Sequence, residues 1–244
     1  MTDLLSSQTL SQRQNVVLDR VLSSGFVTIE ALAEEFGVSP QTVRRDIIAL
    51  AEKGLLQRFH GGAGPVETME AARLDHGAKR DVARVEKYVV GERAAAAIPD
   101  GASIFLDVGT TIECCAARLA RRDGFRIFTT SIRTAMLFDP DPHEVNVIGG
   151  RLSGRDGSLT GEEVVLRLHD LSIDIALIAC SAVDTSGRVM DFSTSKIAVK
   201  KAAMDAARAS FLLSTRSKFG RTALSTIAPL SRFEAVFTED ETPA

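Results

Sequence analysis

One short stretch limits what this chain can fold into more than any other, the nine residues VSPQTVRRD at 38–46. Ser39 is a good helix N-cap, and Pro40 suits the first helical position, where no N–H donor is required. Three apolar residues recur at helical spacing and predict one buried face, namely Val43, Ile47 and Leu50. A helix that begins here therefore buries one face and leaves polar side chains on the other.

The other face of this helix carries residue types that read DNA bases. Gln41, Arg44 and Arg45 fall there, at about 100° per residue. Arginine pairs with guanine through two hydrogen bonds, glutamine pairs with adenine in the same way, and a helix N-terminus attracts phosphate. On this stretch alone, a major-groove helix and an ordinary amphipathic surface helix are both open.

The flanking residues favour a helix-turn-helix. Apolar periodicity predicts helices over 12–23 and 28–36, and Gly37 supplies the tight turn before the third helix. Gly54 ends that third helix, because glycine adopts the left-handed conformation common at helix C-termini. The segment 55–62 then predicts a strand and a glycine turn, which together are typical of the wing of a winged helix.

Residues 37–64, GVSPQTVRRDIIALAEKGLLQRFHGGAG, closely resemble the DNA-binding domain of the DeoR family of bacterial transcriptional regulators. The resemblance implies a DNA-binding domain at 1–65 and double-stranded operator DNA as a partner. It also implies which side chains contact bases, phosphates or the minor groove: Ser39, Gln41, Thr42, Arg44, Arg45, Arg58 and His60.

The net charge of the chain does not by itself favour DNA binding. The 244 residues carry 29 Lys/Arg and 32 Asp/Glu, a formal net charge of −3, so bulk charge does not predict a nucleic-acid partner. Residues 1–65 hold six basic and seven acidic residues, whereas the segment 39–60 holds four basic and two acidic ones. DNA binding is therefore expected to depend on that local cluster.

The sequence carries no signal for export, a membrane or a metal. The N-terminus has no long apolar run, and no stretch approaches the ~18 apolar residues of a membrane span. Three cysteines without C-x-x-C spacing indicate reduced thiols in a cytoplasm. The four histidines lack ligand spacing, so neither a metal site nor a cofactor is expected.

From residue 81 onward, short apolar strands alternate with helical segments, after a stretch at 66–80 whose lack of periodicity predicts a linker. Strands are expected at 104–106, 125–129, 145–148, 173–180, 211–214 and 235–237. Helices are expected at 82–97, from the turn at 107–111 to about 120, and at 131–138, 161–168 and 196–209. This alternation predicts an α/β fold, a mostly parallel sheet covered by helices on both faces.

Ligands bind beyond the carboxyl ends of the strands in such sheets. Turns rich in hydroxyl groups or glycine follow three predicted strands, at 107–111, 129–131 and 149–151, and Lys218 follows a later one. A helix N-terminus with hydroxyl groups, an arginine and a lysine can hold a sugar phosphate. For any single turn, ordinary loop residues are the simpler explanation, since Gly, Ser and Thr are common in turns.

Residues 101–240 are similar to the C-terminal sensor domain of the same family, whose fold resembles ribose-5-phosphate isomerase. Four motifs carry the similarity: DVGTT at 107–111, GGRLSGRDGSLTGE at 149–162, VDTSGRVMDF at 183–192 and SKFGRTAL at 217–224. It implies an effector domain at 81–244, a phosphorylated sugar or polyol as effector, and repression of catabolic genes. The implied effector-binding residues are Asp107, Gly109, Thr110, Thr111, Thr130, Gly149, Gly150, Arg151, Lys196 and Lys218.

The chain departs from the family pattern within this region. Thr130 stands where the family commonly has Asn, Ala179 and Ala182 where it usually has glycines, Thr215 where it usually has Asp, and Lys196 where a Glu often begins the late helix. Fewer carboxylates and an added lysine predict a more cationic site. Such a site suits an effector with more negative charge, or an altered or lost response.

An isomerase that acts on a sugar phosphate is the alternative function. Abstraction of a proton beside a carbonyl requires a positioned base. Asp107 and Glu113 are the evident candidates near the predicted site, and Asp107 is more simply explained as a group that orients hydroxyls. A regulator without enzyme activity is the preferred interpretation, and a homo-oligomer (dimer or tetramer) is expected because a helix-turn-helix usually binds paired half-sites.

Overall fold

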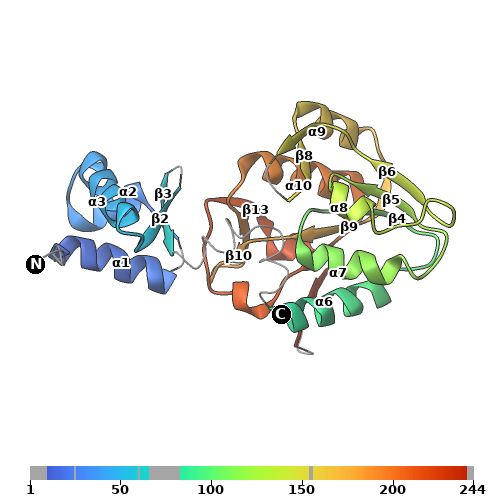
Figure 1. Ribbon diagram of the computed structural model, residues 1–244, viewed down its shortest axis with the longest axis horizontal. Helices are drawn as coiled ribbons and strands as arrows, with labels where there is room; N and C mark the ends of the chain where they lie inside the picture. Colours follow the sequence, from blue (N-terminus) through green and yellow to red (C-terminus); the bar gives the residue numbers. More distant parts are fainter. Residues whose placement is uncertain (1–9, 25, 60, 66–82, 154–155, 241–244) are drawn as a thin grey trace, which may run out of the picture. The chain divides into compact units, whose positions relative to one another are not determined.

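The structure is a computed structural model that describes residues 10–24, 26–59, 61–65, 83–153 and 156–240 (Figure 1). The chain divides into two compact units, Met1–Arg73 and Leu74–Ala244. Each unit has its own hydrophobic core. The predicted linker at 66–80 lies outside the described residues, and the domain limits at 65 and 81 stay predictions.

The described part of the first unit contains three helices and a small sheet. Its elements are α1 (Gln12–Ser24), β1 (Val27–Thr28), α2 (Ile29–Phe36), α3 (Pro40–Glu52), β2 (Leu56–Phe59) and β3 (Gly62–Pro65). The strands pair in the order β1-β3-β2, and both pairings are antiparallel. The predicted winged helix-turn-helix is confirmed, with β2 and β3 as its wing.

Local sequence signals set the ends of α2 and α3. Thr28 caps α2, because its side chain accepts a hydrogen bond from the N–H of Ala31 at 3.1 Å. Gly37 then adopts a left-handed conformation with φ of 62°, which costs glycine little. Ser39 caps α3 by accepting from the N–H of Thr42 at 3.2 Å. The start of α2 and the turn between α2 and α3 therefore follow from three residues of the sequence.

The core of the first unit forms where its helices meet. Val43, Ile47 and Leu50 of α3 are fully buried, each 0% exposed, and belong to a cluster with apolar side chains of α1 and α2. Burial of such a side chain contributes roughly 1.5–3 kcal/mol relative to exposure. The wing closes on this core at Gly62, where an added Cβ would lie 2.5 Å from the ring of Phe26. The close approach of β3 therefore requires glycine there.

The second unit is a larger α/β unit. Its described helices are α6 (Arg84–Ala96), α7 (Thr110–Leu119), α8 (Ile132–Ala135), α9 (Glu162–His169) and α10 (Thr194–Ala206). Its main strands are β4 (Ser103–Leu106), β5 (Arg126–Thr129), β6 (Glu144–Val147), β9 (Ile173–Ala179), β12 (Ala207–Leu213) and β14 (Ala235–Phe237). They form a six-stranded sheet in the order β14-β12-β9-β4-β5-β6, in which every pairing is parallel.

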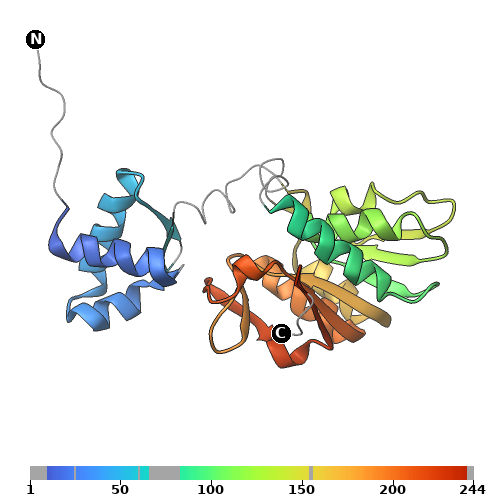
Figure 2. The same cartoon turned by 90° about the horizontal axis from the view of Figure 1, so that it is seen from below.

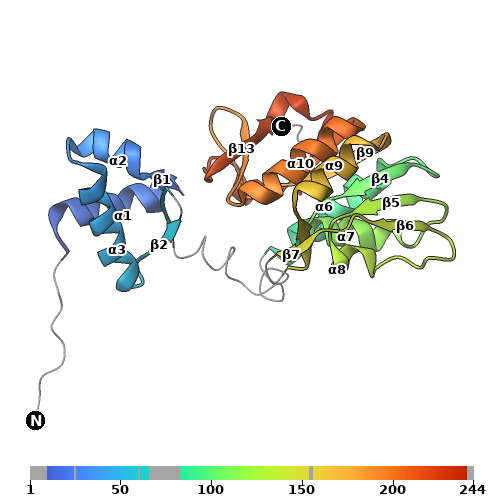
Figure 3. The ribbon, with the colours of Figure 1, turned by 90° about the horizontal axis from the view of Figure 1, so that it is seen from above.

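Alternate residues of each strand face opposite sides of this sheet. In β4, Ile104 and Leu106 belong to the core formed with α6 and α7, whereas Phe105 belongs to the core formed with α9 and α10. Figure 2 shows α6 and α7 side by side in green. Figure 3 shows α9 and α10 on the opposite side of the strands from α7 and α8. The predicted parallel sheet with helices on both faces is confirmed.

Two predicted helices are too long. The helix predicted at 196–209 ends at Ala206, because Ala207 already pairs with Ile173 of β9 as the first residue of β12. Strand pairing overrides the helix propensity of alanine at this point. The helix predicted at 131–138 is reduced to the short α8, which Ser131 caps by accepting the N–H of Thr134.

Two small antiparallel sheets are absent from the sequence prediction. A hairpin of β7 (Arg151–Ser153) and β8 (Ser158–Thr160) follows β6. The second sheet has the order β10-β11-β13 and consists of β10 (Ala182–Val183), β11 (Arg188–Asp191) and β13 (Ser225–Pro229). Short 3-10 helices, η1 (Arg216–Lys218) and η2 (Leu230–Arg232), flank β13 in sequence. These strands carry at most two consecutive apolar residues, so they lack the longer apolar runs that predict most of the main strands.

Candidate functional site

The exposed face of α3 carries the side chains predicted to read DNA. Gln41, Arg44 and Arg45 are exposed, and Thr42 is half-buried. The hydroxyl groups of Ser39 and Thr42 lie 2.9 Å apart, within hydrogen-bonding distance. An amide and two guanidinium groups on one exposed helix face supply the donors that base edges and phosphates accept.

The wing contributes one further predicted DNA-binding residue. Arg58 is exposed on β2, and β2 packs against α3. This arginine and those of α3 therefore belong to the same compact unit. His60 lies outside the described residues, so its predicted contact with the DNA backbone or minor groove stays a prediction.

In the second unit, the candidate effector site lies where the strand order reverses. The chain runs outward from β4 through β5 to β6, and later from β9 through β12 to β14 on the other side. Ligands in such sheets bind beyond the carboxyl ends of the strands at this reversal, which here are β4 and β9. Asp107 directly follows β4, and Cys180 directly follows β9.

Asp107, Asp191 and Lys200 form an ion triple at these strand ends, with Asp191 at 15% side-chain exposure. Lys200 of α10 is ion-paired with Asp107 Oδ2, and its Nζ lies 3.4 Å from Asp191 Oδ2. The same Nζ donates to the carbonyl oxygen of Ala179 at 2.8 Å, while Asp107 Oδ2 accepts the N–H of Ala179 at 3.0 Å. The side chains of Lys200 and Asp107 are each 3% exposed. The ion triple is therefore part of the packed interior and ties α10 to the ends of β4 and β9.

The charges of this triple stabilise each other. Burial alone would lower the pKa of Lys200, but the carboxylates of Asp107 and Asp191 raise it above its ordinary value. Burial alone would raise the pKa of Asp191, but Lys200 and a hydrogen bond from Ser181 at 2.7 Å lower it. Lys200 and Asp191 are therefore both charged at neutral pH.

Lys218 and the N-terminus of α7 supply the groups predicted to hold a phosphate. Lys218 is half-buried, and its Nζ donates to the carbonyl oxygen of Cys180 at 2.6 Å. Gly109 is the N-cap of α7 and provides no side-chain cap. Thr110 and Thr111 form the first turn and are 9% and 2% exposed. A lysine and a helix N-terminus without a side-chain cap are groups that bind anions.

Lys196, predicted to add positive charge to the site, pairs with an acidic side chain. Its Nζ is ion-paired with Asp156 Oδ2, and the two side chains are 24% and 20% exposed. Asp156 Oδ1 also accepts hydrogen bonds from the N–H and the hydroxyl group of Ser158, at 3.3 and 2.9 Å. Burial would raise the pKa of Asp156, but Lys196 lowers it below its ordinary value. Asp156 therefore offsets the charge of Lys196 locally. Because Asp156 belongs to the motif at 149–162 that carries the family resemblance, a site more cationic than that of relatives stays a prediction.

Three of the departures from the family pattern lie inside the packed unit. Ala179, Ala182 and Thr215 are 6%, 1% and 1% exposed. The hydroxyl group of Thr215 lies 2.9 Å from that of Ser217. A Cβ added at Gly109 would lie 3.5 Å from the methyl group of Ala179. Ala179 therefore packs at the beginning of α7, beside the groups predicted to hold a phosphate.

The remaining predicted effector residues lie towards the β7–β8 hairpin. Thr130 is buried, and its carbonyl oxygen accepts the N–H of Leu159 in β8 at 2.7 Å. Gly149 and Gly150 precede β7, and Arg151 is exposed as its first residue. Among the described contacts, none joins Arg151 to Lys218 or to the ion triple. The convergence of this arginine with the lysine around one phosphate stays a prediction.

Comparison with known proteins identifies the family. A model of the DeoR-like helix-turn-helix domain matches residues 13–69, and a model of the DeoR C terminal sensor domain matches residues 83–240. The chain belongs to the DeoR family.

Relatives of this DeoR-family chain match over nearly its whole length. It is 33% identical to the glycerol-3-phosphate regulon repressor of Escherichia coli (strain K12), over 96% of this chain and 92% of the relative. It is also 33% identical to the HTH-type transcriptional repressor CsqR of the same strain, over 98% and 92%. The lactose phosphotransferase system repressor of Lactococcus lactis is 29% identical, over 86% and 83%. The relatives named here are transcriptional regulators.

Solved structures resemble the DeoR-family chain more distantly. Ribose 5-phosphate isomerase A of Methanocaldococcus jannaschii has a TM-score of 0.42 and 19% identity, over 56% of this chain and 55% of that one. The delta subunit of eIF2B from Chaetomium thermophilum has a TM-score of 0.47 and 17% identity, over 67% and 58%. These similarities concern the α/β arrangement alone.

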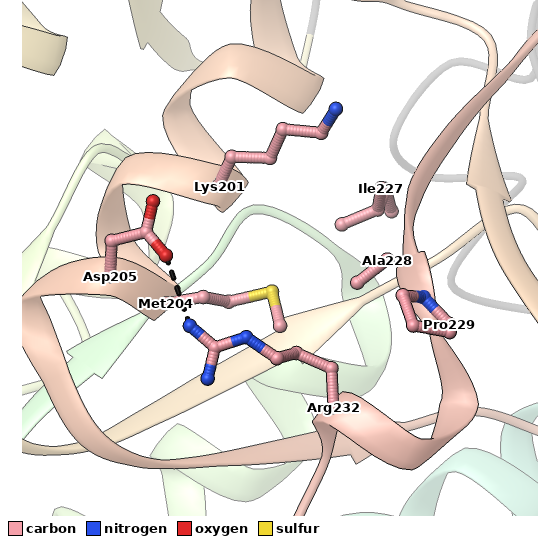
Figure 4. Close-up of a pocket in the computed structure, with 7 residues that line it drawn as sticks. All are labelled: Lys201, Met204, Asp205, Ile227, Ala228, Pro229 and Arg232. Atoms are coloured by element: carbon pink, nitrogen blue, oxygen red, sulfur yellow. Dashed lines mark hydrogen bonds and ion pairs between the residues drawn. The ribbon is translucent and has the colours of Figure 1, made fainter.

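The DeoR-family chain also has a surface pocket on the α10 side of the sheet. It has a volume of about 240 Å³ and lies between α10 and the β13–η2 segment (Figure 4). Its base is apolar, with Met204 and Ile227, and its rim includes Lys201 and the ion pair between Arg232 and Asp205 at 3.1 Å. This pocket contains none of the residues predicted to bind an effector.

Three charged residues of the strand-end region were missed by sequence reasoning. Lys200 lies four residues after Lys196, so a helical reading places both on one side of α10. Asp191 closes the VDTSGRVMDF motif, and Asp156 lies within GGRLSGRDGSLTGE. Both acidic residues belong to motifs that indicate the family, and neither has a sequence spacing to its lysine partner that predicts the ion pair.

No group of three or more His, Cys, Asp or Glu side chains in the described part of the chain could hold a metal ion. None of the described helices is long and apolar enough to cross a membrane.

Proposed function

We propose that this protein is an operator-binding repressor of carbohydrate or polyol catabolism genes, and that a phosphorylated small molecule relieves repression. The effector site in this proposal lies beyond the carboxyl ends of β4 and β9. One observation carries the proposal, which is that two features occur in the same chain. The first is a helix that exposes Gln41, Arg44 and Arg45, and the second is a parallel sheet with cationic groups where its strand order reverses.

The DNA-binding part of the proposal rests on α3. Its core face is fully buried, so the opposite face must meet solvent or a partner. Arginine side chains there can pair with guanine, and the first turn can approach a phosphate. Proteins that use this motif usually bind paired half-sites as dimers, so we include a homo-oligomer in the proposal. Binding to the cell's own DNA also places the protein in the cytoplasm.

The effector part rests on the balance of charge at the strand ends. Lys200 is matched by Asp107 and Asp191, and Lys196 is matched by Asp156. Lys218, by contrast, donates to the carbonyl oxygen of Cys180. A cation whose described partner is a neutral carbonyl, near an uncapped helix N-terminus, favours an anionic ligand such as a phosphate monoester.

The relatives support the choice of phosphorylated polyols and sugars as candidates. One controls the glycerol-3-phosphate regulon and another the lactose phosphotransferase system, by their names. We therefore include glycerol 3-phosphate and sugar phosphates among the first ligands to test.

The geometry disfavours Asp107 as the base of an isomerase. A general base must be free to accept a proton from the substrate. Asp107 Oδ2 is occupied by Lys200 and by the N–H of Ala179, and the residue is 2% exposed. The proposal therefore assigns the strand-end region to binding.

DNA binding is tested first, because the protein can be used to isolate its own operator from genomic DNA. Genomic fragments retained by the full-length protein are sequenced, and the shared site is used as a duplex in binding titrations. We expect steep loss of affinity with rising salt, because phosphate contacts release counterions. Retention of random fragments alone would contradict sequence-specific regulation.

The effector is then tested by calorimetry with glycerol 3-phosphate, fructose phosphates and tagatose phosphates, with and without the duplex. The factor by which a ligand lowers DNA affinity must equal the factor by which DNA lowers ligand affinity. Lys218→Ala should weaken the ligand and leave DNA binding intact. If none of these compounds binds at millimolar concentration, the effector part of the proposal is wrong even where DNA binding stands. Turnover of the same compounds by the pure protein would instead support an isomerase.

A further inference from the structure

A buried carboxylate connects the recognition helix α3 to α1. Asp46 lies directly after Arg44 and Arg45 in α3, yet it is only 7% exposed. The Nε of Arg13 in α1 donates to Asp46 Oδ2 at 2.5 Å. The Nε2 of Gln14 lies 3.5 Å from Asp46 Oδ1, a longer contact from the same turn of α1. Both carboxylate oxygens of Asp46 therefore face the first turn of α1.

The first turn of α1 is itself held by a capping box. The hydroxyl group of Ser11 accepts the N–H of Gln14 at 3.2 Å, and the side-chain carbonyl of Gln14 accepts the N–H of Ser11 at 3.1 Å. This reciprocal pair satisfies two donors at the start of a helix. The amide of Gln14 therefore caps α1 with its oxygen and faces Asp46 with its nitrogen. The four residues Ser11, Arg13, Gln14 and Asp46 form a network that we call the α1–α3 clamp.

The apolar core alone leaves the rotation of α3 less well defined. Val43, Ile47 and Leu50 hold one face of the helix against the core, but apolar packing is not directional. A hydrogen-bonded ion pair is directional, and guanidinium groups hold carboxylates in a defined plane. Reading bases requires side chains placed accurately along the groove, because a hydrogen bond lengthened by about 1 Å falls outside bonding distance.

We propose that Asp46 is a positioning residue for sequence-specific DNA recognition. Through the α1–α3 clamp it sets the direction in which α3 presents Gln41, Arg44 and Arg45. The clamp also neutralises the acidic side chain that directly follows those arginines, so the DNA-facing surface keeps its positive charge. Arg13 acts on Asp46 and does not itself contact the DNA phosphates.

The experiment compares binding to two duplexes by the full-length protein. One duplex carries the site that the wild-type protein selects from a random library, and the other carries the same bases in shuffled order. Three variants break the clamp or weaken it: Arg13→Met, Asp46→Ala and Asp46→Asn. Arg20→Gln is the matched control, since it removes an arginine of α1 that pairs with Glu35 of α2 at 2.6 Å.

We expect Arg13→Met and Asp46→Ala to lower affinity for the selected duplex by about tenfold or more, the size of one lost base-reading contact. Affinity for the shuffled duplex should change less than about twofold, because phosphate contacts supply non-specific binding. Asp46→Asn should retain part of the preference, since its amide oxygen still accepts a hydrogen bond from Arg13. Arg20→Gln should keep the wild-type ratio of the two affinities.

A purely structural role would give a different result. Partial unfolding lowers both affinities by the same factor, so an unchanged ratio in both Arg13→Met and Asp46→Ala overturns the proposal. Arg13→Met removes a side chain that is 38% exposed, so it tests the clamp even where Asp46→Ala fails to fold. The salt dependence gives a second criterion. The quantity is the slope of the logarithm of the DNA-binding constant against the logarithm of the salt concentration. If the magnitude of this slope falls by about one in Arg13→Met, Arg13 contacts a phosphate, and this also overturns the proposal.

Discussion

The recognition helix and the strand ends of the sheet handle charge in opposite ways. On α3, Arg44 and Arg45 are exposed, and the caps that define the helix come from residues within three positions of each other. At the strand ends, Lys200 is buried and pairs with Asp107, which is 93 residues earlier in the chain. The first region is ready to meet an external anion, and the second has already satisfied most of its charges internally.

The comparison shows that a cationic residue in a motif is not by itself a free binding group. Lys218 belongs to the SKFG motif and Lys196 is a departure from the family pattern, and both are predicted effector-binding residues. Lys196 is paired with Asp156, whereas Lys218 donates to a backbone carbonyl. Their availability to a ligand therefore differs. The following variants test how far the two regions differ in stability and in binding.

The largest effect is expected at the ion triple. Lys200→Met leaves the buried carboxylate of Asp107 and the partly buried one of Asp191 without their cation, which should lower the free energy of unfolding of the second unit by roughly 3–5 kcal/mol. The chain has one Tyr and no Trp, and that tyrosine is Tyr88 of α6. Urea unfolding followed by tyrosine fluorescence therefore reports on the second unit.

The neighbouring Lys201→Met is the matched control for Lys200→Met. Lys201 lies on the same helix but is exposed, so its loss should change the free energy of unfolding by no more than about 0.5 kcal/mol. DNA affinity per folded molecule should be the same in both variants. Equal free energies of unfolding for the two variants would contradict the prediction that the buried Lys200 contributes more to stability than the exposed Lys201.

A smaller effect is expected on the DNA-facing side. Arg44→Ala or Arg45→Ala should weaken binding to the selected duplex by about 1–3 kcal/mol if the side chain reads a base. The tyrosine-detected unfolding of the second unit should not change. Fluorescence anisotropy of the labelled duplex gives the affinity, and unchanged binding in both variants would place the recognition surface elsewhere.

Sequence reasoning succeeded where the determinants are local. The Ser39 cap, the Gly37 turn and the spacing of the buried residues of α3 lie within a few positions of each other, and the structure confirms them. The parallel sheet also followed from local alternation of strands and helices. These features depend on backbone preference and on which face is apolar, both of which can be read in a short window.

The strand-end contacts could not be obtained in that way. Lys200 meets Asp107 only because α10 packs across the ends of β4 and β9, and Asp156 meets Lys196 only because the β7–β8 hairpin returns to α10. Neither pair of residues stands at a spacing in the sequence from which the contact can be predicted. The motifs located the region correctly as a set of strand ends, but the charge balance within it required the tertiary structure.

The smallest effect is expected at the Asp156–Lys196 pair, which tests whether this region admits an anion. If Lys196 helps to hold an effector phosphate, that phosphate must compete with Asp156 for the same ammonium group. The pair is partly exposed, and such pairs contribute about 0–1 kcal/mol. Removing the competitor in Asp156→Asn should therefore tighten binding of glycerol 3-phosphate or inorganic phosphate by up to about fivefold.

Lys196→Met should have the opposite effect and weaken the same ligands. Asp123→Asn is the control for Asp156→Asn, since it makes the same change in net charge at an exposed position before β5, at the other end of that strand. Isothermal titration of the three variants and the wild-type chain measures the changes. Weaker binding in Asp156→Asn, matching that in Lys196→Met, would mean that Asp156 orients Lys196 for the ligand. Equal affinities in all four proteins would place the ligand away from α10, at Lys218 and the N-terminus of α7.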